Sequence, residues 1–573
     1  MKNLLYYGDN LPILRNKDYF PDQFIDLIYL DPPFNSNTTY NVLFSEKNGT
    51  KASAQIKAFE DTWHWDRTSA LLFQDIVENG PEKISQAMQA FRMLLGDNDM
   101  MAYLSNMAPR LLELHRVLKK TGSLYLHCDS TASHYLKIIL DAIFNPKNFR
   151  NEIIWRRTSS HGTKKSFGPI HDTILFYVKT NSYHFRVIKL PYMKGHVENR
   201  YTKDKNGNYK FTSGGNILTG PGATLGESGK TWRGFNPTKK NRHWAVPGFL
   251  SKKMPENFMK KSVTEKLEYL YQKGLIEIKK GSVWPTPVRY LEKGDGHPIQ
   301  DIWAYQPYTE GTVYGTNKGI DADVAWLGTT DPERLGYPTQ KPEGILERII
   351  RSSCPKDGIV LDPFCGCGTA VIVSEKLNRN WIGIDITHLA ISLIKHRLED
   401  SFGKNIEYDV IGEPASLSGA KELAHQDRFQ FQWWILGKIG AKPIEKKKGA
   451  DRGVDGRLYF HIGKDLKTKQ IVISVKSGHV GVKDIRDLRG VIEREKAEIG
   501  VLITLEEPTK PMIKEAVNAG FYSPKGYTNK YSRIQILTVE DIFQGKKIDS
   551  PRTNNGFKIK QAQKRDKTKQ SKL

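Results

Sequence analysis

The chain has 573 residues, and 87 lysines and arginines against 63 aspartates and glutamates give it a formal net charge of +24. This length exceeds what one hydrophobic core serves, so we expect three or four folding units. The basic excess suits a polyanionic partner, for which nucleic acid leads and an anionic membrane surface is the rival. No stretch approaches the roughly 20 apolar residues of a membrane span, and no signal-type apolar core follows Met1. We therefore expect no membrane insertion and a cytoplasmic location.

A proline-rich turn follows the first apolar run. Residues 24–30 predict a buried strand, and the tetrapeptide Asp31-Pro32-Pro33-Phe34 comes directly after it. Ligands collect at the carboxyl ends of such strands in open α/β sheets, and two prolines stiffen the turn. Asp31 and the Pro32 carbonyl could accept hydrogens from an amino group on a flat ring, with Phe34 stacked on that ring. Taken alone, the tetrapeptide is equally typical of a proline-capped strand end.

The region 185–330 breaks the alternation of strands and helices and is rich in Gly, Lys, Tyr and Trp. Basic and aromatic residues alternate in Trp232-Arg233 and in Arg242-His243-Trp244. Such a mixture suits phosphate contacts and the reading of base edges, and we interpret the region as a target-recognition insertion. The alternative is an irregular insertion with exposed lysines.

A glycine-rich turn follows a later strand. Residues 358–369 read GIVLDPFCGCGT, a short apolar strand that breaks into a turn before a helix. Gly366 and Gly368 let the backbone turn tightly and approach a ligand, and the helix amino end favours an anion. The next strand ends on Asp385, which is placed to bind ribose hydroxyls.

Two other nucleotide sites fit this turn poorly. Val371 stands where the dinucleotide fingerprint needs a third glycine, and the Lys and Ser/Thr of a phosphate-binding loop are absent. The cysteines Cys365 and Cys367 are interpreted as small fillers of the turn rather than as a metal or redox pair.

Together these segments resemble a known family. Asp-Pro-Phe-x-Gly-x-Gly-Thr is similar to the AdoMet-binding signature of DNA amino-methyltransferases, and the turn at Asp31 resembles their catalytic signature. The resemblance implies methyl transfer from S-adenosyl-L-methionine (AdoMet) to an exocyclic amine in double-stranded DNA, as in restriction–modification systems. It places the following residues at the cofactor: Asp9, Thr339, Lys341, Asp362, Phe364, Gly366, Gly368, Thr369 and Asp385.

The order of the segments resembles the β arrangement of this family, a circularly permuted Rossmann-like sheet with an insertion between its halves. Asp at the first position of the catalytic signature is more typical of adenine-N6 enzymes, so we favour adenine over cytosine-N4 transfer. A non-catalytic DNA-binding protein that keeps only the folds is the rival from another class.

A further unit follows the methyltransferase-like part. Asp455 and Lys476 resemble the PD-(D/E)xK nuclease core, especially that of Mrr-type restriction endonucleases. The resemblance implies a Mg²⁺ site at Asp455 and a lysine that helps to activate water. Ser474 stands where a second acid or a Gln is expected, and Gln432 where the first helix often carries Glu. Cleavage and a catalytically dead, DNA-binding nuclease fold therefore both stay open.

The predicted organisation is an α/β chain whose parts differ in role. A homodimer and a separate restriction subunit are both open as partners. The predicted parts are a catalytic methyltransferase half at 1–184, a target-recognition insertion at 185–330, an AdoMet-binding half at 331–412, a linker at 413–425, a restriction-endonuclease-like domain at 426–545 and a basic disordered tail at 546–573.

Overall fold

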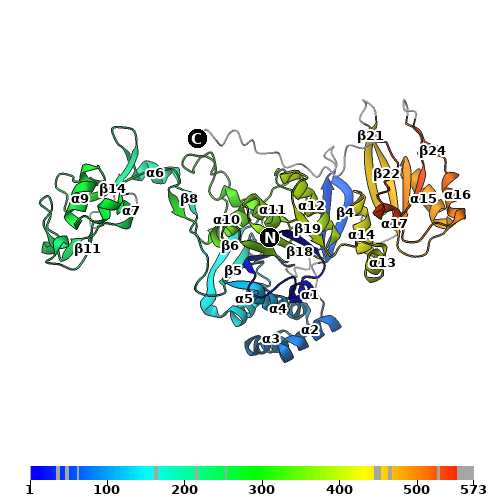
Figure 1. Cartoon of the computed structure of the whole chain (residues 1–573), viewed down its shortest axis with the longest axis horizontal. Coiled ribbons are helices and arrows are strands. Elements are labelled where there is room, and N and C mark those ends of the chain that lie inside the picture. The colour runs from blue at the N-terminus through cyan, green and yellow to red at the C-terminus, as the bar shows by residue number, and fades with distance from the viewer. Residues whose placement is uncertain are drawn as a thin grey trace. The chain divides into compact units, whose positions relative to one another are not determined.

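The computed structural model describes most of the chain (Figure 1). By the contacts between its residues, the chain divides into a unit of residues 1–186, 301–305 and 323–573 and a second unit of residues 187–300 and 306–322. In the part of the chain that the structure describes, no helix combines the length and the apolar character that crossing a bilayer requires. The described residues are 2–33, 39–45, 51–60, 64–160, 165–212, 217–251, 254–337, 339–443, 453–462, 467–524 and 529–551.

A nine-stranded sheet forms the centre of the first unit, in the order β16-β6-β7-β5-β2-β17-β18-β1-β19. Neighbouring strands are parallel except around β7, which runs antiparallel to β5 and β6. The strands are β1 (Asn3–Tyr7), β2 (Ile25–Leu30), β5 (Leu118–Cys128), β6 (Phe149–Arg156), β7 (His171–Val178), β16 (Ile302–Trp303), β17 (Ile359–Asp362), β18 (Asn380–Asp385) and β19 (Tyr408–Ile411).

Strands β2 and β17 lie side by side although they are far apart in sequence. They pair in parallel, with Leu27 opposite Val360 and Ile28 opposite Leu361. A buried carboxylate reinforces the pairing, because Oδ2 of Asp26 accepts the backbone N–H of Ile359 at 2.9 Å. Their carboxyl ends therefore meet at one edge of the sheet, as the permuted Rossmann-like prediction requires, and that fold prediction is confirmed.

Helices cover both faces of this sheet, α4 and α5 on one side and α11 and α12 on the other (Figure 1). Side chains alternate along the strands, so Tyr6 packs into the core under α4 while Leu5 packs into the core under α12. The helices of this part are α1 (Asn10–Arg15), α2 (Arg67–Asn79), α3 (Glu82–Leu95), α4 (Asp99–Val117), α5 (Ser133–Phe144), α10 (Glu343–Ser353), α11 (Thr369–Lys376) and α12 (His388–Phe402), and the strands β3 (Thr39–Ser45) and β4 (Lys51–Glu60) pair separately as a hairpin.

The second unit lies within the predicted insertion and has its own small core, built around Trp232, Trp244 and Phe258 (green in Figure 1). Its larger sheet has the order β13-β14-β10-β9. Its elements are β8 (Lys189–Pro191), α6 (Lys194–Arg200), β9 (Thr202–Lys203), β10 (Tyr209–Thr212), β11 (Thr219–Pro221), β12 (Arg242–Trp244), α7 (Gly248–Ser251), α8 (Glu256–Met259), α9 (Val263–Gln272), β13 (Ile276–Glu277), β14 (Thr286–Tyr290) and β15 (Gly296–Pro298).

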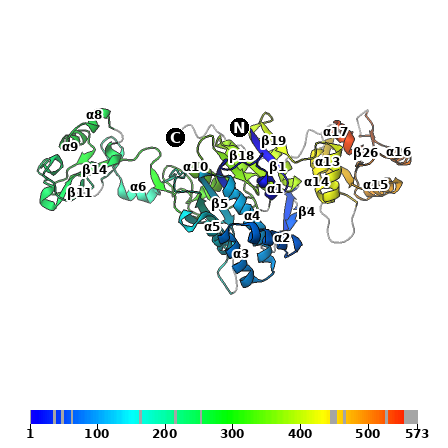
Figure 2. The same cartoon turned by 60° about the horizontal axis from the view of Figure 1, so that its bottom comes forward.

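A five-stranded sheet follows in the C-terminal part, in the order β20-β21-β22-β23-β26 (yellow to red in Figure 2). Ile471 and Ile473 face one core and Val472 faces the other, so helices cover both faces of this sheet. Its elements are α14 (Arg428–Lys438), β20 (Lys442–Pro443), β21 (Gly456–Ile462), β22 (Lys467–Lys476), α15 (Val482–Arg494), β23 (Ile499–Thr504), α16 (Lys510–Val517), β24 (Phe521–Tyr522), β25 (Tyr531–Ser532), β26 (Ile534–Thr538) and α17 (Val539–Phe543).

Residues 413–425, which we expected to be a linker, contain most of helix α13 (Leu417–Gln426). The Ser416 side chain caps this helix by accepting the N–H of Gly419 at 3.2 Å. Ala420 and Leu423 are buried in the core shared with α14. The correction follows from apolar residues at helical spacing behind a serine cap, which outweigh the Pro and Ser that suggested a linker. The other predicted boundaries stay predictions, and residues 552–573 of the tail lie outside the described residues.

Candidate active site

A cavity of about 400 Å³ lies at the carboxyl ends of β2, β17 and β18. Asp31, Pro32 and Pro33 line it, and so do residues 362–367 of the glycine-rich turn. The segments that we predicted to be catalytic and cofactor-binding therefore share one pocket, while Phe34 lies outside the described residues.

The two carboxylate oxygens of Asp31 have different surroundings. Oδ2 accepts a hydrogen bond from Nζ of Lys341, and the two side chains form an ion pair. Oδ1 is buried and has no hydrogen-bond partner among the described residues. Asp31 thus has one oxygen held by Lys341 and one buried oxygen without a hydrogen-bond partner among the described residues.

The glycine-rich turn needs its glycines for two reasons. Gly366 and Gly368 have φ of +47° and +77°, which residues with a Cβ rarely adopt. A Cβ on Gly368 would also lie 2.6 Å from Cγ1 of Ile394. Gly368 does not line the cavity itself; it begins helix α11 and lets that helix pack closely on α12.

Asp385 holds the turn as well as lining the cavity. Its Oδ2 accepts the N–H of Gly366 at 2.9 Å, and its Oδ1 accepts from both the N–H and the hydroxyl of Thr387 at 2.8 Å. Because a carboxylate has about four acceptor positions, Asp385 keeps capacity for a ligand hydroxyl.

The cavity carries more acidic than basic side chains. Asp9, Asp31, Asp362 and Asp385 line it, against Arg110 and Lys341. Burial raises the pKa of Asp362 well above its usual range, and the charges of Asp31 and Asp385 raise it further. Burial also raises the pKa of Asp385. Such a pocket favours a cationic ligand, because added positive charge offsets the repulsion between its carboxylates.

Helix α4 contributes a residue that sequence reasoning missed. Arg110 donates from Nη2 to Asp9 and from Nε to Asn10, both at 2.7 Å, and Asn10 in turn donates to the Pro363 carbonyl at 2.7 Å. The first loop of the chain is thereby tied to the cofactor turn. An arginine within an otherwise apolar helix could have indicated a functional residue, but the neighbouring sequence does not identify its partners. Other lining residues that were missed are Tyr29, Asn106, Tyr337, Leu346, Ile386 and Thr387.

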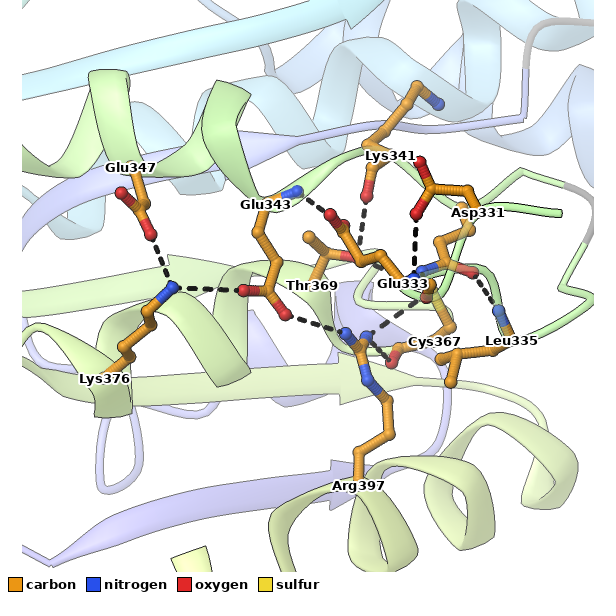
Figure 3. A network of polar contacts seen from close by, with 11 residues as sticks. Asp331, Glu333, Leu335, Lys341, Glu343, Glu347, Cys367, Thr369, Lys376 and Arg397 are labelled. Carbon is orange, nitrogen blue, oxygen red and sulfur yellow. Dashed lines mark hydrogen bonds and ion pairs between the residues drawn. The ribbon is translucent and has the colours of Figure 1, made fainter. Parts of the chain in front are cut away.

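A polar network lies behind the turn and holds the segment that contains Thr339 and Lys341 (Figure 3). The Thr369 hydroxyl donates to the carbonyl of Lys341 at 3.3 Å. Arg397 of α12 donates to the Cys367 carbonyl at 2.7 Å and pairs with Glu343 at 3.5 Å. The hydrogen bond from Thr369 to the Lys341 carbonyl therefore joins two predicted site residues, and Arg397 holds the turn through the Cys367 carbonyl. Thr339, Phe364 and Thr369 line the cavity, as do Asp9, Lys341 and Asp362.

Of the three predicted nuclease residues, Asp455 and Ser474 are in contact, whereas the side chain of Lys476 pairs elsewhere. Asp455 precedes β21 and accepts the N–H of Val475 at 2.7 Å, the hydroxyl of Ser474 at 3.4 Å and the side-chain amide of Gln432 at 3.0 Å. Lys476 ends β22, and its Nζ lies 4.0 Å from Asp484. Among the described residues there is no cluster of three or more His, Cys, Asp or Glu side chains that could hold a metal ion.

Comparisons with known proteins agree with this division. Residues 25–396 match a DNA methylase family model, and residues 434–521 match a restriction endonuclease model. The Type II methyltransferase M.EcaI of Enterobacter cloacae is 28% identical over 298 residues, which are 52% of this chain and 57% of that protein. The Mod subunit of the Type III restriction-modification enzyme StyLTI of Salmonella typhimurium is 24% identical over 414 residues, 72% of this chain and 55% of that subunit.

The chain therefore spans little more than half the length of these two relatives. Among solved structures, the cytosine-N4-specific PvuII DNA methyltransferase is similar at 12% identity and a TM-score of 0.31, covering 70% of this chain and 88% of that one. The methylase model covers more than half of the chain, in the part that forms the nine-stranded sheet and the cavity. The chain thus belongs to the DNA methylase family and carries, at residues 434–521, a restriction endonuclease domain of the Mrr type.

Proposed function

We propose that this chain transfers a methyl group from AdoMet to the N6 amine of adenine in double-stranded DNA, as the modification activity of a restriction–modification system. The observation that carries the proposal is the single cavity that joins the Asp31 turn to the glycine-rich turn. Membership of the DNA methylase family supports the same reaction class.

The residues of the cavity fit AdoMet. A cationic sulfonium suits a pocket with four carboxylic side chains and two basic ones. Gly366 lines the cavity without a side chain, and Asp385 has acceptor capacity for ribose hydroxyls. When bound, AdoMet supplies a methyl group that is already strongly electrophilic, so these residues have to orient the reactants rather than activate the methyl.

Asp31 and the proline turn are proposed to receive the target amine. Oδ1 of Asp31 and the carbonyl of Pro32 would accept the two amine hydrogens and localise the nitrogen lone pair toward the cavity. Asp31 would then hold the proton that the amine loses. Because the cavity is recessed at the sheet edge, the target nucleotide must leave the duplex stack, which costs a few kcal/mol.

The choice of adenine rests on Asp31, since aspartate at this position is more typical of the adenine-N6 members of the family. Cytosine-N4 transfer is the alternative, because the exocyclic amine of cytosine would need the same hydrogen-bond acceptors. We propose the unit at 187–300 and 306–322 for target recognition, supported by its place in the predicted insertion and by its lysines and arginines.

For the C-terminal domain we propose DNA cleavage through Asp455, Ser474 and Lys476 with Mg²⁺ at Asp455. A second candidate is a DNA-binding module without cleavage. The three protein donors on the Asp455 carboxylate favour it, because they use acceptor positions that a Mg²⁺ ion would need.

The two candidates for this domain are separated by incubating the full chain with unmethylated duplex DNA and Mg²⁺. Cleavage that Lys476→Ala removes supports the nuclease. An uncut substrate across Mg²⁺ and salt conditions supports the binding module.

The methyltransferase proposal is tested by transfer of labelled methyl from AdoMet to duplex DNA. Asp31→Ala should lower the transfer rate by at least about 10³-fold, because it removes the acceptor and the proton carrier. Its dissociation constant for AdoMet should stay within about threefold of the wild type. Asp400→Ala is the matched control, since Asp400 is exposed on α12 and does not line the cavity. An unimpaired Asp31→Ala variant would refute the role of Asp31.

A further inference from the structure

Lys341 forms its ion pair in an unexpected place. The family resemblance assigns its segment to AdoMet, yet its ammonium group donates to Oδ2 of Asp31, 310 positions earlier in the sequence. The two side chains are only 9% and 15% exposed. The charge of Lys341 is therefore directed at the catalytic turn.

The contact with Lys341 gives the two carboxylate oxygens of Asp31 different roles. Lys341 fixes Oδ2, while Oδ1 stays buried without a partner among the described residues. A carboxylate held at one oxygen cannot rotate freely, so its second oxygen keeps one direction. That oxygen is the one our proposed function assigns to the target amine.

Lys341 is itself held from both sides. Its Nζ also donates to the carbonyl of Thr339 at 3.3 Å, and its own carbonyl accepts from the hydroxyl of Thr369 at 3.3 Å. Thr369 is the first residue of α11, directly after the cofactor turn. Thr369 thus holds the backbone of Lys341, and the side chain of Lys341 in turn holds Asp31.

Competition between carboxylates explains why a cation is needed at this point. Asp31, Asp362 and Asp385 line one cavity, and Asp31 and Asp385 are charges that disfavour ionisation of Asp362. The ammonium group in contact with Asp31 brings a positive charge into this acidic cavity.

We infer that Lys341 is a positioning residue for methyl transfer, which holds the carboxylate of Asp31 in one orientation, rather than a ligand of AdoMet. The inference rests on the proposed function. The alternative, in which Lys341 binds the carboxylate of the methionine moiety, predicts the opposite kinetic behaviour, so the two can be separated.

The test uses the full chain, with two measurements for each variant: the single-turnover rate of methyl transfer to duplex DNA at saturating AdoMet, and the dissociation constant of AdoMet from calorimetry. Lys341→Met should lower the rate at least about 100-fold, the scale of a misplaced acid–base group. It should leave the AdoMet dissociation constant within about threefold. Lys341→Arg, which keeps the charge, should recover part of the rate.

Lys137→Met is the matched control. Lys137 pairs with Asp141 on α5, is 29% exposed and does not line the cavity. Its substitution should leave both measurements unchanged.

A double variant is needed in case Lys341→Met does not fold, because that substitution leaves the largely buried Asp31 without its ion-pair partner. Asp31→Asn with Lys341→Met replaces the ion pair by two neutral side chains. Relative to Asp31→Asn alone, this double variant should bind AdoMet within about threefold. The inference is overturned if the AdoMet dissociation constant of the double variant is about tenfold or more above that of Asp31→Asn. It is also overturned if Lys341→Met transfers methyl at the wild-type rate. A wild-type chain that transfers no methyl at all would instead refute the proposed function.

Discussion

Glu333 should make the methylase part less stable as the pH rises. Burial raises the pKa of Glu333 from 4.5 to about 7, and the neighbouring Glu343 carboxylate adds to the effect. The side chain lies inside the network behind the cofactor turn, where it accepts the N–H of Glu343 at 2.7 Å (Figure 3). Protonated Glu333 keeps this hydrogen bond and removes the repulsion from Glu343.

The sign follows from the two pKa values. The folded chain keeps its proton on Glu333 up to about pH 7, whereas the unfolded chain releases it near 4.5. The stabilisation is therefore complete below pH 4.5 and is lost as the pH rises through about 7. A pKa difference of this size corresponds to at most about 3 kcal/mol, and partial exposure of the side chain reduces it to about 2 kcal/mol.

Glu333→Gln isolates the effect, because the amide oxygen can accept the same N–H without a charge. Denaturant unfolding should show the variant about 2 kcal/mol more stable than the wild type near pH 8.5 and nearly equal to it near pH 5. Glu407→Gln, at an exposed position of the same part of the chain, should show no such dependence. An equal difference between Glu333→Gln and the wild type at both pH values would refute the reasoning.

Three further substitutions test other parts of the site. Asp385→Ala should raise the KM for AdoMet about 10- to 100-fold with little change in the saturated rate, because it removes the acceptor that we propose for the ribose hydroxyls and the hydrogen bond to the N–H of Gly366. Steady-state kinetics check this, and an unchanged KM would contradict the assignment. Gly368→Ala should destabilise the chain by about 1–3 kcal/mol, since it combines a positive φ with a close approach to Ile394. Thermal unfolding measures the loss, and a melting temperature equal to the wild type would argue against the strain. Lys476→Ala should remove any Mg²⁺-dependent DNA cleavage while leaving methyl transfer intact, as a nicking assay beside a methylation assay would show; retained cleavage would exclude Lys476.

The sequence could predict that the two distant segments meet, because each has an acidic residue at the carboxyl end of an apolar strand. Asp31 and Asp362 each close an apolar strand of an α/β pattern, and parallel strands bring their carboxyl ends to one edge. The glycine requirement at Gly366 and Gly368 was also local, since a tight turn before a helix asks for positive φ.

The contacts that complete the site could not be predicted, because they depend on tertiary packing. Arg110 is one arginine in a long helix, and only the folded chain brings it to Asp9. Lys341 could be assigned to the pocket by resemblance, but its contact with Asp31 depends on how the two halves of the sheet meet. Helix α13 was missed because Pro414 and Ser416 suggested a linker, whereas its stability comes from apolar contacts with the following domain.

The central claim is that one pocket aligns the methyl group of AdoMet with an exocyclic amine of DNA. The most direct measurement is mass spectrometry of nucleosides from duplex DNA incubated with the chain and AdoMet that carries a deuterated methyl group. We predict a deuterated methyl group on N6 of deoxyadenosine. A label on N4 of deoxycytidine would change the target but keep the pocket, and DNA without label in the presence of bound AdoMet would contradict the account.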